Sequence, residues 1–438
     1  MATNFLDLLI VALCWGLALI WPHFQPNPSG LSLVVDSPII VSLGLCTYRL
    51  LSSSLGKSKS LKAIISLVSV GGFAVGFIST GLKHDSIYGI WSHLGAGTMK
   101  LNGRNFIFGD LAHLTSAASC SKPLITGTNV CDPWGRLFNQ NSDVGKLFRV
   151  LYFTNIELVG FFALLAFLIS LFWATRYLRI ESLSPYTMLL TPVVVLAIDR
   201  GNELTSVTFI MVGLYYLRSD RHFSQLIGAV ALAFAVFFKL WPIFLVLSLL
   251  IVQWSRLKMA TRILLLMPFL YWALKIQEIR EIIRVTQSGS PFGTSFGLKL
   301  FLSPQLNLVQ IFILVIACLG VTYLLIRLGN QDLRDFTRSI SGTKAMLWIS
   351  PLMLTYSAIW ASGDSYIYRM VVLIPLVLIL SAKGIFEFRW PKVAITAILV
   401  TSISSRLPVT LAVSSSLALY FIYVVFTVWR DGTLKLRR

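Results

Sequence analysis

The chain has 438 residues, of which 56% are hydrophobic and only 13% charged, and its formal net charge is +19. A water-soluble domain could not bury that much apolar surface, so the composition excludes an ordinary soluble protein. The basic balance does not indicate a nucleic-acid partner, because Lys and Arg cluster in short segments between apolar runs and not on one soluble domain.

The apolar runs are long and continuous, which is typical of membrane-spanning helices and not of the weak alternation of an outer-membrane barrel. We therefore predict an all-α, polytopic transmembrane helical bundle with about 14 spans. The predicted spans are 5–21, 34–51, 62–81, 149–173, 185–198, 203–217, 224–238, 240–254, 261–275, 305–327, 345–361, 370–383, 391–405 and 408–429. The first run has no basic segment before it and no cleavage site, so it is expected to be a retained helix.

The basic segments alternate with nearly neutral ones along the chain. If Lys-rich and Arg-rich loops face the cytoplasm, both termini are cytoplasmic and residues 1–438 form a single multi-pass domain of a bacterial plasma (inner) membrane. Two long segments then lie outside, 83–147 between the third and fourth spans and 276–304. Loops this long in compact proteins are usually functional. The second begins with IQEIREIIR, whose isoleucines recur at helical spacing and predict an amphipathic helix on the membrane surface.

The first outer loop contains the sequence FGDL, in which Asp110 follows an apolar lead-in, with His113 three residues later. A single outer carboxylate is usually only solvated. Here the apolar residues could hold Asp110 at the bilayer surface, where desolvation would raise its pKa toward that of a general base.

Two of the five cysteines, Cys120 and Cys131, lie outside the predicted spans, in this loop. An oxidising exterior would let them form a disulfide, and free thiols are the alternative. A zinc site is disfavoured, because His113 would add only a third ligand and no C-x-x-C spacing occurs. No metal and no cofactor are predicted.

The sequence DRGN, residues 199–202, interrupts an apolar run and places Arg200 at an outer helix end. By itself it would be a tight turn closed by an Asp–Arg pair. Lys239 in FFKLWPIF and Arg369 in SYIYR fall at the same predicted membrane level, however, and cations at such a level are costly and tend to mark substrate paths. Together the three cations predict a receptor for a phosphate group. A lipid-linked phosphate combines an anionic head, which the cations could bind, with an apolar tail. No nucleotide-binding motif is present, so a nucleotide-sugar or ATP as the substrate is disfavoured.

In the order and predicted sidedness of FGDL, GTNVCDPWGRLFN, DRGN, FFKLWPIFLVL and DSYIYR, the chain resembles membrane glycosyltransferases of the GT-C type, in particular glycosyltransferase family 87, the polyprenol-phosphate-mannose-dependent mannosyltransferases. The resemblance implies a GT-C-like bundle in which Asp110 acts as general base in an inverting transfer. It also implies that Arg200, Lys239 and Arg369 bind the donor phosphate. The neighbouring residues Asn202, His113, Asp364 and Tyr368 are expected to support the site.

The expected donor is a polyprenyl-phosphate-linked mannose or other pentose or hexose, and the expected acceptor is a glycolipid or glycan. Membrane lipid is the other expected partner. Two alternatives remain open at this stage. One is a lipid or polyisoprenoid flippase or transporter, whose pathway the same cations would line. The other is a polysaccharide polymerase or ligase.

Overall fold

The structure is a computed structural model that describes residues 99–101, 104–106, 108–180, 184–189, 191–287, 295–302, 306–362, 365–403 and 408–431. Within these residues the fold is almost entirely helical, as predicted, and the only strands form two short ribbons. In the first ribbon, β1 (Met99–Leu101) pairs antiparallel with β2 (Arg104–Phe106). In the second, β3 (Ser295–Phe296) pairs antiparallel with β4 (Ser365–Tyr366), which joins the second outer loop to the segment that leads to Arg369.

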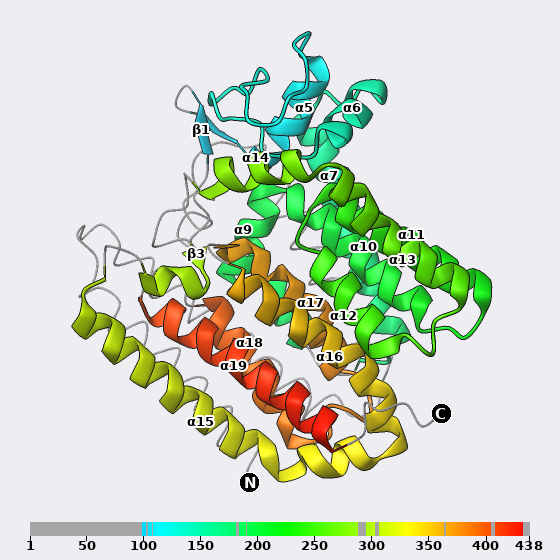
Figure 1. Cartoon of the computed structure of the whole chain (residues 1–438), viewed down its shortest axis with the longest axis vertical. Coiled ribbons are helices and arrows are strands. Elements are labelled where there is room, and N and C mark those ends of the chain that lie inside the picture. Colours follow the sequence, from blue (N-terminus) through cyan, green and yellow to red (C-terminus); the bar gives the residue numbers. More distant parts are fainter. Residues whose placement is uncertain are drawn as a thin grey trace, which may run out of the picture.

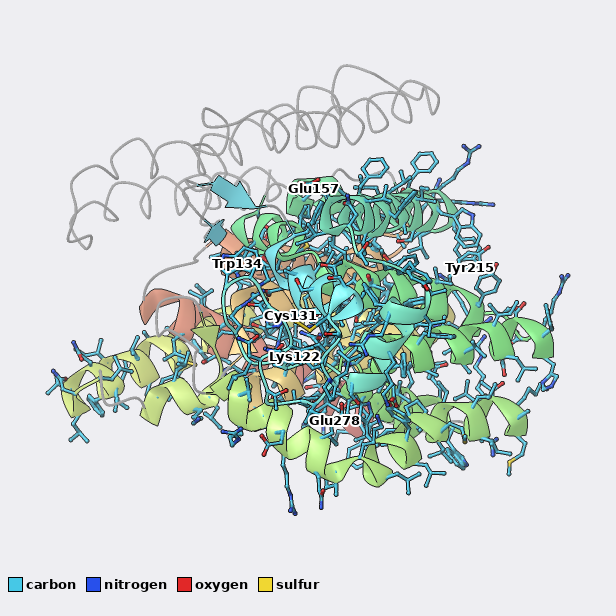
Figure 2. All side chains as sticks on the ribbon, turned by 90° about the horizontal axis from the view of Figure 1, so that it is seen from above. Lys122, Cys131, Trp134, Glu157, Tyr215 and Glu278 are labelled. Atoms are coloured by element: carbon cyan, nitrogen blue, oxygen red, sulfur yellow. A yellow bond between two sulfur atoms is a disulfide. The ribbon has the colours of Figure 1, made fainter. Side chains whose placement is uncertain are left out.

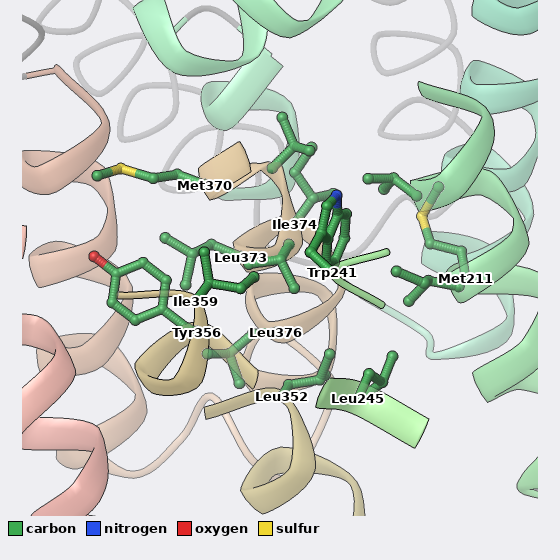
Figure 3. Close-up of a cluster of buried hydrophobic side chains, with 14 of the residues drawn as sticks. Met211, Trp241, Leu245, Leu352, Tyr356, Ile359, Met370, Leu373, Ile374 and Leu376 are labelled. Atoms are coloured by element: carbon green, nitrogen blue, oxygen red, sulfur yellow. The ribbon is translucent and has the colours of Figure 1, made fainter. Parts of the chain in front are cut away.

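The helical bundle has an N-terminal and a C-terminal half. The first half contains α7 (Ile156–Tyr177), α8 (Ser184–Leu189), α9 (Pro192–Arg200), α10 (Asn202–Leu217), α11 (His222–Phe238), α12 (Ile243–Gln253) and α13 (Met259–Leu274). The second half contains η5 (Leu298–Leu302), α15 (Leu308–Arg338), α16 (Ile340–Ala361), η6 (Ile367–Val372), α17 (Leu373–Leu380), α18 (Arg389–Ile403) and α19 (Pro408–Arg430). The halves meet where α12 packs against α16 and where α9 and α10 pack against η6. Figure 3 shows this core, in which Trp241 lies among Leu245, Ile374 and other buried apolar side chains.

One end of the bundle is covered by residues 108–150, which we call the cap (Figure 1). The cap contains η3 (Gly109–Leu111), α5 (Ala112–Ser119), α6 (Ser142–Val150) and the loop between the two α-helices. Helix α14 (Ile276–Gln287), the predicted amphipathic helix, lies across the same end and bends away from α13 by 75°. The two outer loops predicted from the sequence thus meet at one end of the molecule.

The predicted count of about 14 membrane spans is wrong for the described residues. By length and apolar character, three of the described helices can cross a membrane, or up to four if the bent pair α13 and α14 is one span. The three are α7, residues Leu308–Asn330 of α15 and residues Leu411–Arg430 of α19. The predicted spans 5–21, 34–51 and 62–81 lie outside the described residues.

Helix length explains the difference. The predicted span 203–217 corresponds to α10, which has 16 residues. At 1.5 Å per residue such a helix reaches about 24 Å, less than the roughly 30 Å of a bilayer hydrocarbon core. The predicted span 185–198 is divided into α8 and α9, because Pro192 begins a new helix. Several apolar runs are therefore partial-length helices that pack on one another.

Helix α15 exposes large apolar side chains along its length. Leu308, Phe312 and Ile316 are each more than half exposed, and only 17% of the apolar window of this helix is buried. Exposed apolar surface of this extent indicates contact with lipid or with another apolar surface. The helix begins at a capping box, in which Asn307 and Gln310 each accept a hydrogen bond from the backbone N–H of the other.

Candidate functional site

Asp110 lies in η3, directly above the turn between α9 and α10. Gly201 forms that turn with a φ of +77°, which favours glycine over any residue with a side chain. A Cβ atom on Gly201 would lie 2.9 Å from Leu111 Cδ1 and 3.0 Å from Phe108 Cβ. The missing side chain therefore lets η3 rest on the turn, and this contact brings the cap to DRGN.

The carboxylate of Asp110 joins the cap to the bundle. Its Oδ1 lies 2.9 Å from Nη1 of Arg136, which belongs to the cap, and 3.4 Å from Nη1 of Arg200, which ends α9. The side chain of Asp110 is 14% exposed, and those of Arg136 and Arg200 are 23% and 24% exposed. The cluster is therefore largely shielded by protein but still in contact with solvent.

Arg136 is held by a tight turn in the sequence CDPWGR. Its guanidinium donates to both carboxylate oxygens of Asp132, at 2.9 and 3.1 Å, and to the carbonyl of Gly109 at 2.8 Å. Asp132 Oδ2 also accepts the backbone N–H groups of Trp134 and Arg136. These bonds fix the guanidinium before any ligand arrives. Arg136 and Asp132 were not predicted as site residues, although their i,i+4 spacing beside a Gly is a visible signal in CDPWGR.

Cys120 and Cys131 form a disulfide that closes an 11-residue separation in the cap. Seen from above, Lys122, Cys131 and Trp134 lie over the centre of the molecule, with Glu278 of α14 at the edge of this group (Figure 2). Of the two alternatives left open by the sequence, the structure has the disulfide. The link joins the end of α5 to the turn that holds Arg136, so it keeps the two sides of the cap together.

A second polar network fastens the cap to the corner between α13 and α14. The carboxylate of Glu278 accepts from the backbone N–H of Ser142 at 2.6 Å and from Thr126 Oγ1 at 3.0 Å. Lys275 Nζ lies 2.5 Å from Asp143 Oδ2 and 3.1 Å from Glu278 Oε2. The cap is thus anchored on two sides, at Arg200 and at this corner.

The expectation that the pKa of Asp110 is raised is wrong. Burial does raise the pKa, but the positive charges of Arg200 and Arg136, with that of Lys239 and with that of His113 once it is protonated in acid, outweigh burial and hold the pKa below its usual range. The error arose because the sequence shows the apolar residues around Asp110 but not the cations that folding brings from distant positions. Asp110 is therefore an ionised acceptor in this structure.

His113 faces the same cluster from α5 but is neutral at pH 7. Its side chain is 4% exposed, and Nδ1 lies 3.8 Å from Asp132 Oδ1, too far for a hydrogen bond. Burial and the charge of Arg136 lower its pKa to about 4, although Asp132 and Asp110 act in the opposite direction. His113 is therefore a buried neutral imidazole next to the ion-pair network.

Lys239 occupies the break between α11 and α12, between the predicted spans 224–238 and 240–254, and Pro242 directly precedes the second helix. Its Nζ lies 3.6 Å from Oε1 of Glu203, a residue in the first turn of α10 that is only 1% exposed. The other oxygen, Oε2, accepts from the indole N–H of Trp241 at 2.7 Å. Glu203 thus provides a buried countercharge for Lys239 from the first turn of α10. Glu203 was not predicted as a site residue, because nothing local relates it to a lysine 36 positions later.

The remaining predicted cation, Arg369, lies in η6, which packs against α9. Lys239 is close enough to both Asp110 and Arg369 for their charges to interact. Asp110, Arg200, Lys239 and Arg369 therefore gather at the junction of the cap and the bundle, although up to 259 residues separate them in sequence (369 minus 110).

The structure places the other predicted residues less fully. Asp364 lies outside the described residues, as do the side chains of Asn202 and Tyr368. DRGN does form a turn, but Arg200 contacts Asp110 of the cap. Among the residues that the structure describes, no group of three or more His, Cys, Asp or Glu side chains could hold a metal ion.

Comparisons of the chain with protein-family models, with curated proteins and with solved structures find no match.

The lowered pKa of His113 predicts a loss of stability in mild acid. Between pH 6.5 and about 4 the unfolded chain binds a proton that the folded chain excludes, so stability present above pH 6.5 falls as the pH drops through this window. The limiting loss is about 3 kcal/mol. In thermal unfolding of the detergent-solubilised protein, His113→Gln is expected to flatten this dependence. The control His222→Gln, at an exposed position, should keep it, and a wild-type midpoint that is constant from pH 7 to 4.5 would contradict the assignment.

Proposed function

We propose that the chain is a membrane glycosyltransferase that transfers a sugar from a polyprenyl-phosphate donor to a glycolipid or glycan acceptor at the extracytoplasmic face of a bacterial plasma membrane. The observation that carries the proposal is the gathering of Asp110 with Arg200, Lys239 and Arg369 at one end of the bundle. A carboxylate next to several cations provides both a proton acceptor and a receptor for a phosphate leaving group.

The location of this cluster suits a substrate with a charged head and an apolar tail. The cluster lies where the disulfide-linked cap meets the bundle, and the bundle contains helices that are long and apolar enough to cross a membrane. A polyprenyl tail could remain in the lipid while its phosphate reaches the cations. Disulfides form in oxidising compartments, which agrees with an extracytoplasmic cap.

The three cations differ in how firmly they are held. Lys239 forms an ion pair at 3.6 Å with Glu203, whose other carboxylate oxygen accepts from the indole of Trp241, so its ammonium lies beside a carboxylate that is itself held in place. Arg200 can offer two parallel N–H donors to phosphate oxygens. We assign both residues, with Arg369, to the donor phosphate. As the bond between the anomeric carbon and the phosphate oxygen breaks, these charges stabilise the negative charge that develops on the leaving group.

Asp110 is assigned to the acceptor. The acceptor hydroxyl oxygen attacks the anomeric carbon, the bond to the phosphate oxygen breaks with its electron pair, and the hydroxyl proton passes to the Asp110 carboxylate. The lowered pKa of Asp110 keeps the carboxylate ionised, so it is ready to accept this proton over a wide pH range. The hydroxyl becomes a much stronger acid as its oxygen bonds to carbon, so a weak base can receive the proton late in the transfer.

Donor binding should also strengthen this base. Arg200 lies 3.4 Å from Asp110, a looser contact than the 2.9 Å to Arg136. A donor phosphate that binds Arg200 would neutralise part of the charge that lowers the pKa of Asp110. The carboxylate would then become more basic when the donor is in place, which couples donor binding to activation of the acceptor.

Asp110→Asn should abolish transfer while leaving the fold intact. Removal of a general base typically costs 10²- to 10⁴-fold in rate, so we expect turnover to fall by at least about 100-fold. The assay combines purified protein with polyprenyl-phosphate-linked mannose or arabinose and candidate glycolipid acceptors. Asp220→Asn, an exposed carboxylate paired with Arg256, serves as the control and should retain turnover. Normal turnover by Asp110→Asn would remove the assignment, and movement of donor lipid without a new glycoside would indicate a transporter instead.

Arg200→Gln should weaken donor use and shift the pH dependence of the reaction. Hydrogen bonds to charged groups contribute roughly 1.5–3 kcal/mol, so the KM for donor is expected to rise about tenfold or more. The loss of the cation also raises the pKa of Asp110, so the acidic limb of the kcat/KM profile moves to higher pH. Arg256→Gln, which removes a guanidinium from the other end of α10, is the matched control. An unchanged KM together with an unchanged pH profile would assign DRGN to a turn without a binding role.

A further inference from the structure

A second candidate binding site, a cavity lined by both apolar and basic side chains, lies at the other end of the bundle, away from the cap. A cavity of about 620 Å³ opens between α7, α10, α16 and α17. Arg200 lies two residues before the start of α10, and Arg218, which lines the cavity, directly follows its last residue. The 16 residues of that helix separate the two sites by about 24 Å. The cavity is therefore distinct from the Asp110 cluster.

The wall of the cavity is apolar and its border is basic. The apolar wall includes Leu178, Met211, Leu214, Pro375, Leu378 and Ile379. Four cations also line it, Arg179, Arg218, Lys344 and Lys383, and no Asp or Glu is among the described lining residues. In the described part of the chain, no carboxylate forms an ion pair with Arg179, Arg218 or Lys344. Such a combination is complementary to a molecule with an anionic head and a hydrocarbon tail.

Aromatic side chains mark the level of the membrane surface beside this border. Tyr177 and Tyr215 line the cavity with ring centroids 4.4 Å apart, and Trp173 lies 4.1 Å from Tyr215. Trp173 and Tyr177 are 40% and 46% exposed on the outside of the bundle. Exposed Trp and Tyr rings of this kind concentrate where hydrocarbon meets headgroups. The cations at the border are then at the depth of lipid phosphates.

The backbone of Arg179 has a left-handed conformation at the end of α7. Helix α7 ends in a Schellman motif, in which the N–H of Arg179 bonds the Arg176 carbonyl and the N–H of Ile180 bonds the Thr175 carbonyl. Arg179 has a φ of +52°, in the position where glycine is usual. Glycine is more favourable than arginine for the backbone at this position, so Arg179 can be replaced by glycine without disturbing the end of α7.

We propose that this cavity binds an anionic phospholipid of the membrane leaflet at that end of the bundle. The acyl chains enter between α7, α10, α16 and α17, and the headgroup phosphate binds Arg179, Arg218, Lys344 and Lys383. The bound lipid joins helices of the N-terminal half to helices of the C-terminal half, and this linkage stabilises the bundle. The lipid site takes no part in the glycosyl transfer proposed above, and the evidence for it does not depend on that proposal.

The test uses the left-handed position of Arg179, because glycine there removes the guanidinium and relieves the backbone at the same time. Tyr152 is a matched control, since it also has a φ of +52° in a Schellman motif, at the end of α6 in the cap. The delipidated full chain is titrated with phosphatidylglycerol or phosphatidylcholine, and bound lipid is counted by native mass spectrometry. Lys344→Gln, at an exposed position, provides a second variant.

Wild type and Tyr152→Gly should both bind phosphatidylglycerol at least about fivefold more tightly than phosphatidylcholine. Arg179→Gly and Lys344→Gln should each lose about fivefold in affinity for phosphatidylglycerol, and Arg179→Gly should keep its melting temperature in lipid-free detergent. Equal binding of the two lipids, or unchanged affinity in both variants, would overturn the proposal. Equal stabilisation of wild type by inorganic phosphate alone would also overturn it, because the apolar cavity would then have no role.

Discussion

The carboxylate of Asp110 is the contact on which the site depends, because it is shared between Arg136 of the cap and Arg200 of the bundle. A largely shielded carboxylate needs such partners, since desolvation of an unpaired charge is costly. The absence of a side chain at Gly201 is what lets η3 approach closely enough for the pairing. The disulfide and the Asp132–Arg136 turn hold the cap side of the pair, and α9 holds the other side.

The need of a buried charge for partners also explains the arrangement of Glu203 and Lys239. Glu203 is almost completely buried; its Oε2 accepts a hydrogen bond from the indole of Trp241, and its Oε1 forms an ion pair at 3.6 Å with Lys239. Lys239 is thereby kept at the level of Asp110 without pairing with it directly. Cations that are held in place before a ligand arrives need no reorganisation when charge develops, which is the main requirement for electrostatic catalysis. The proposed transfer uses this preorganisation.

The sequence predicted much of the helical architecture, because helix formation follows from local apolar pattern and helix breakers. The predicted spans 203–217 and 261–275 fall on α10 and α13, and Pro242 separates α11 from α12. The predicted number of membrane spans was wrong, because an apolar run does not reveal whether a helix crosses the lipid or ends partway inside a bundle. The partners Arg136 and Glu203, and the direction of the Asp110 pKa shift, were also missed. The pairing of Arg136 with Asp110, the pairing of Glu203 with Lys239 and the pKa shift all depend on contacts between distant segments, and only the local Asp132–Arg136 pair can be seen in one stretch of sequence.

The most direct test of the shared carboxylate is a double-mutant cycle between Asp110 and Arg200, measured as the unfolding free energy of wild type, Asp110→Asn, Arg200→Gln and the double variant. Residues in one ion-pair network couple by about 0.5–3 kcal/mol, so the cost of the double variant should fall short of the sum of the single costs by an amount in this range. Strictly additive costs would show that the cap and α9 are not joined at this carboxylate, and the account of the site would be wrong.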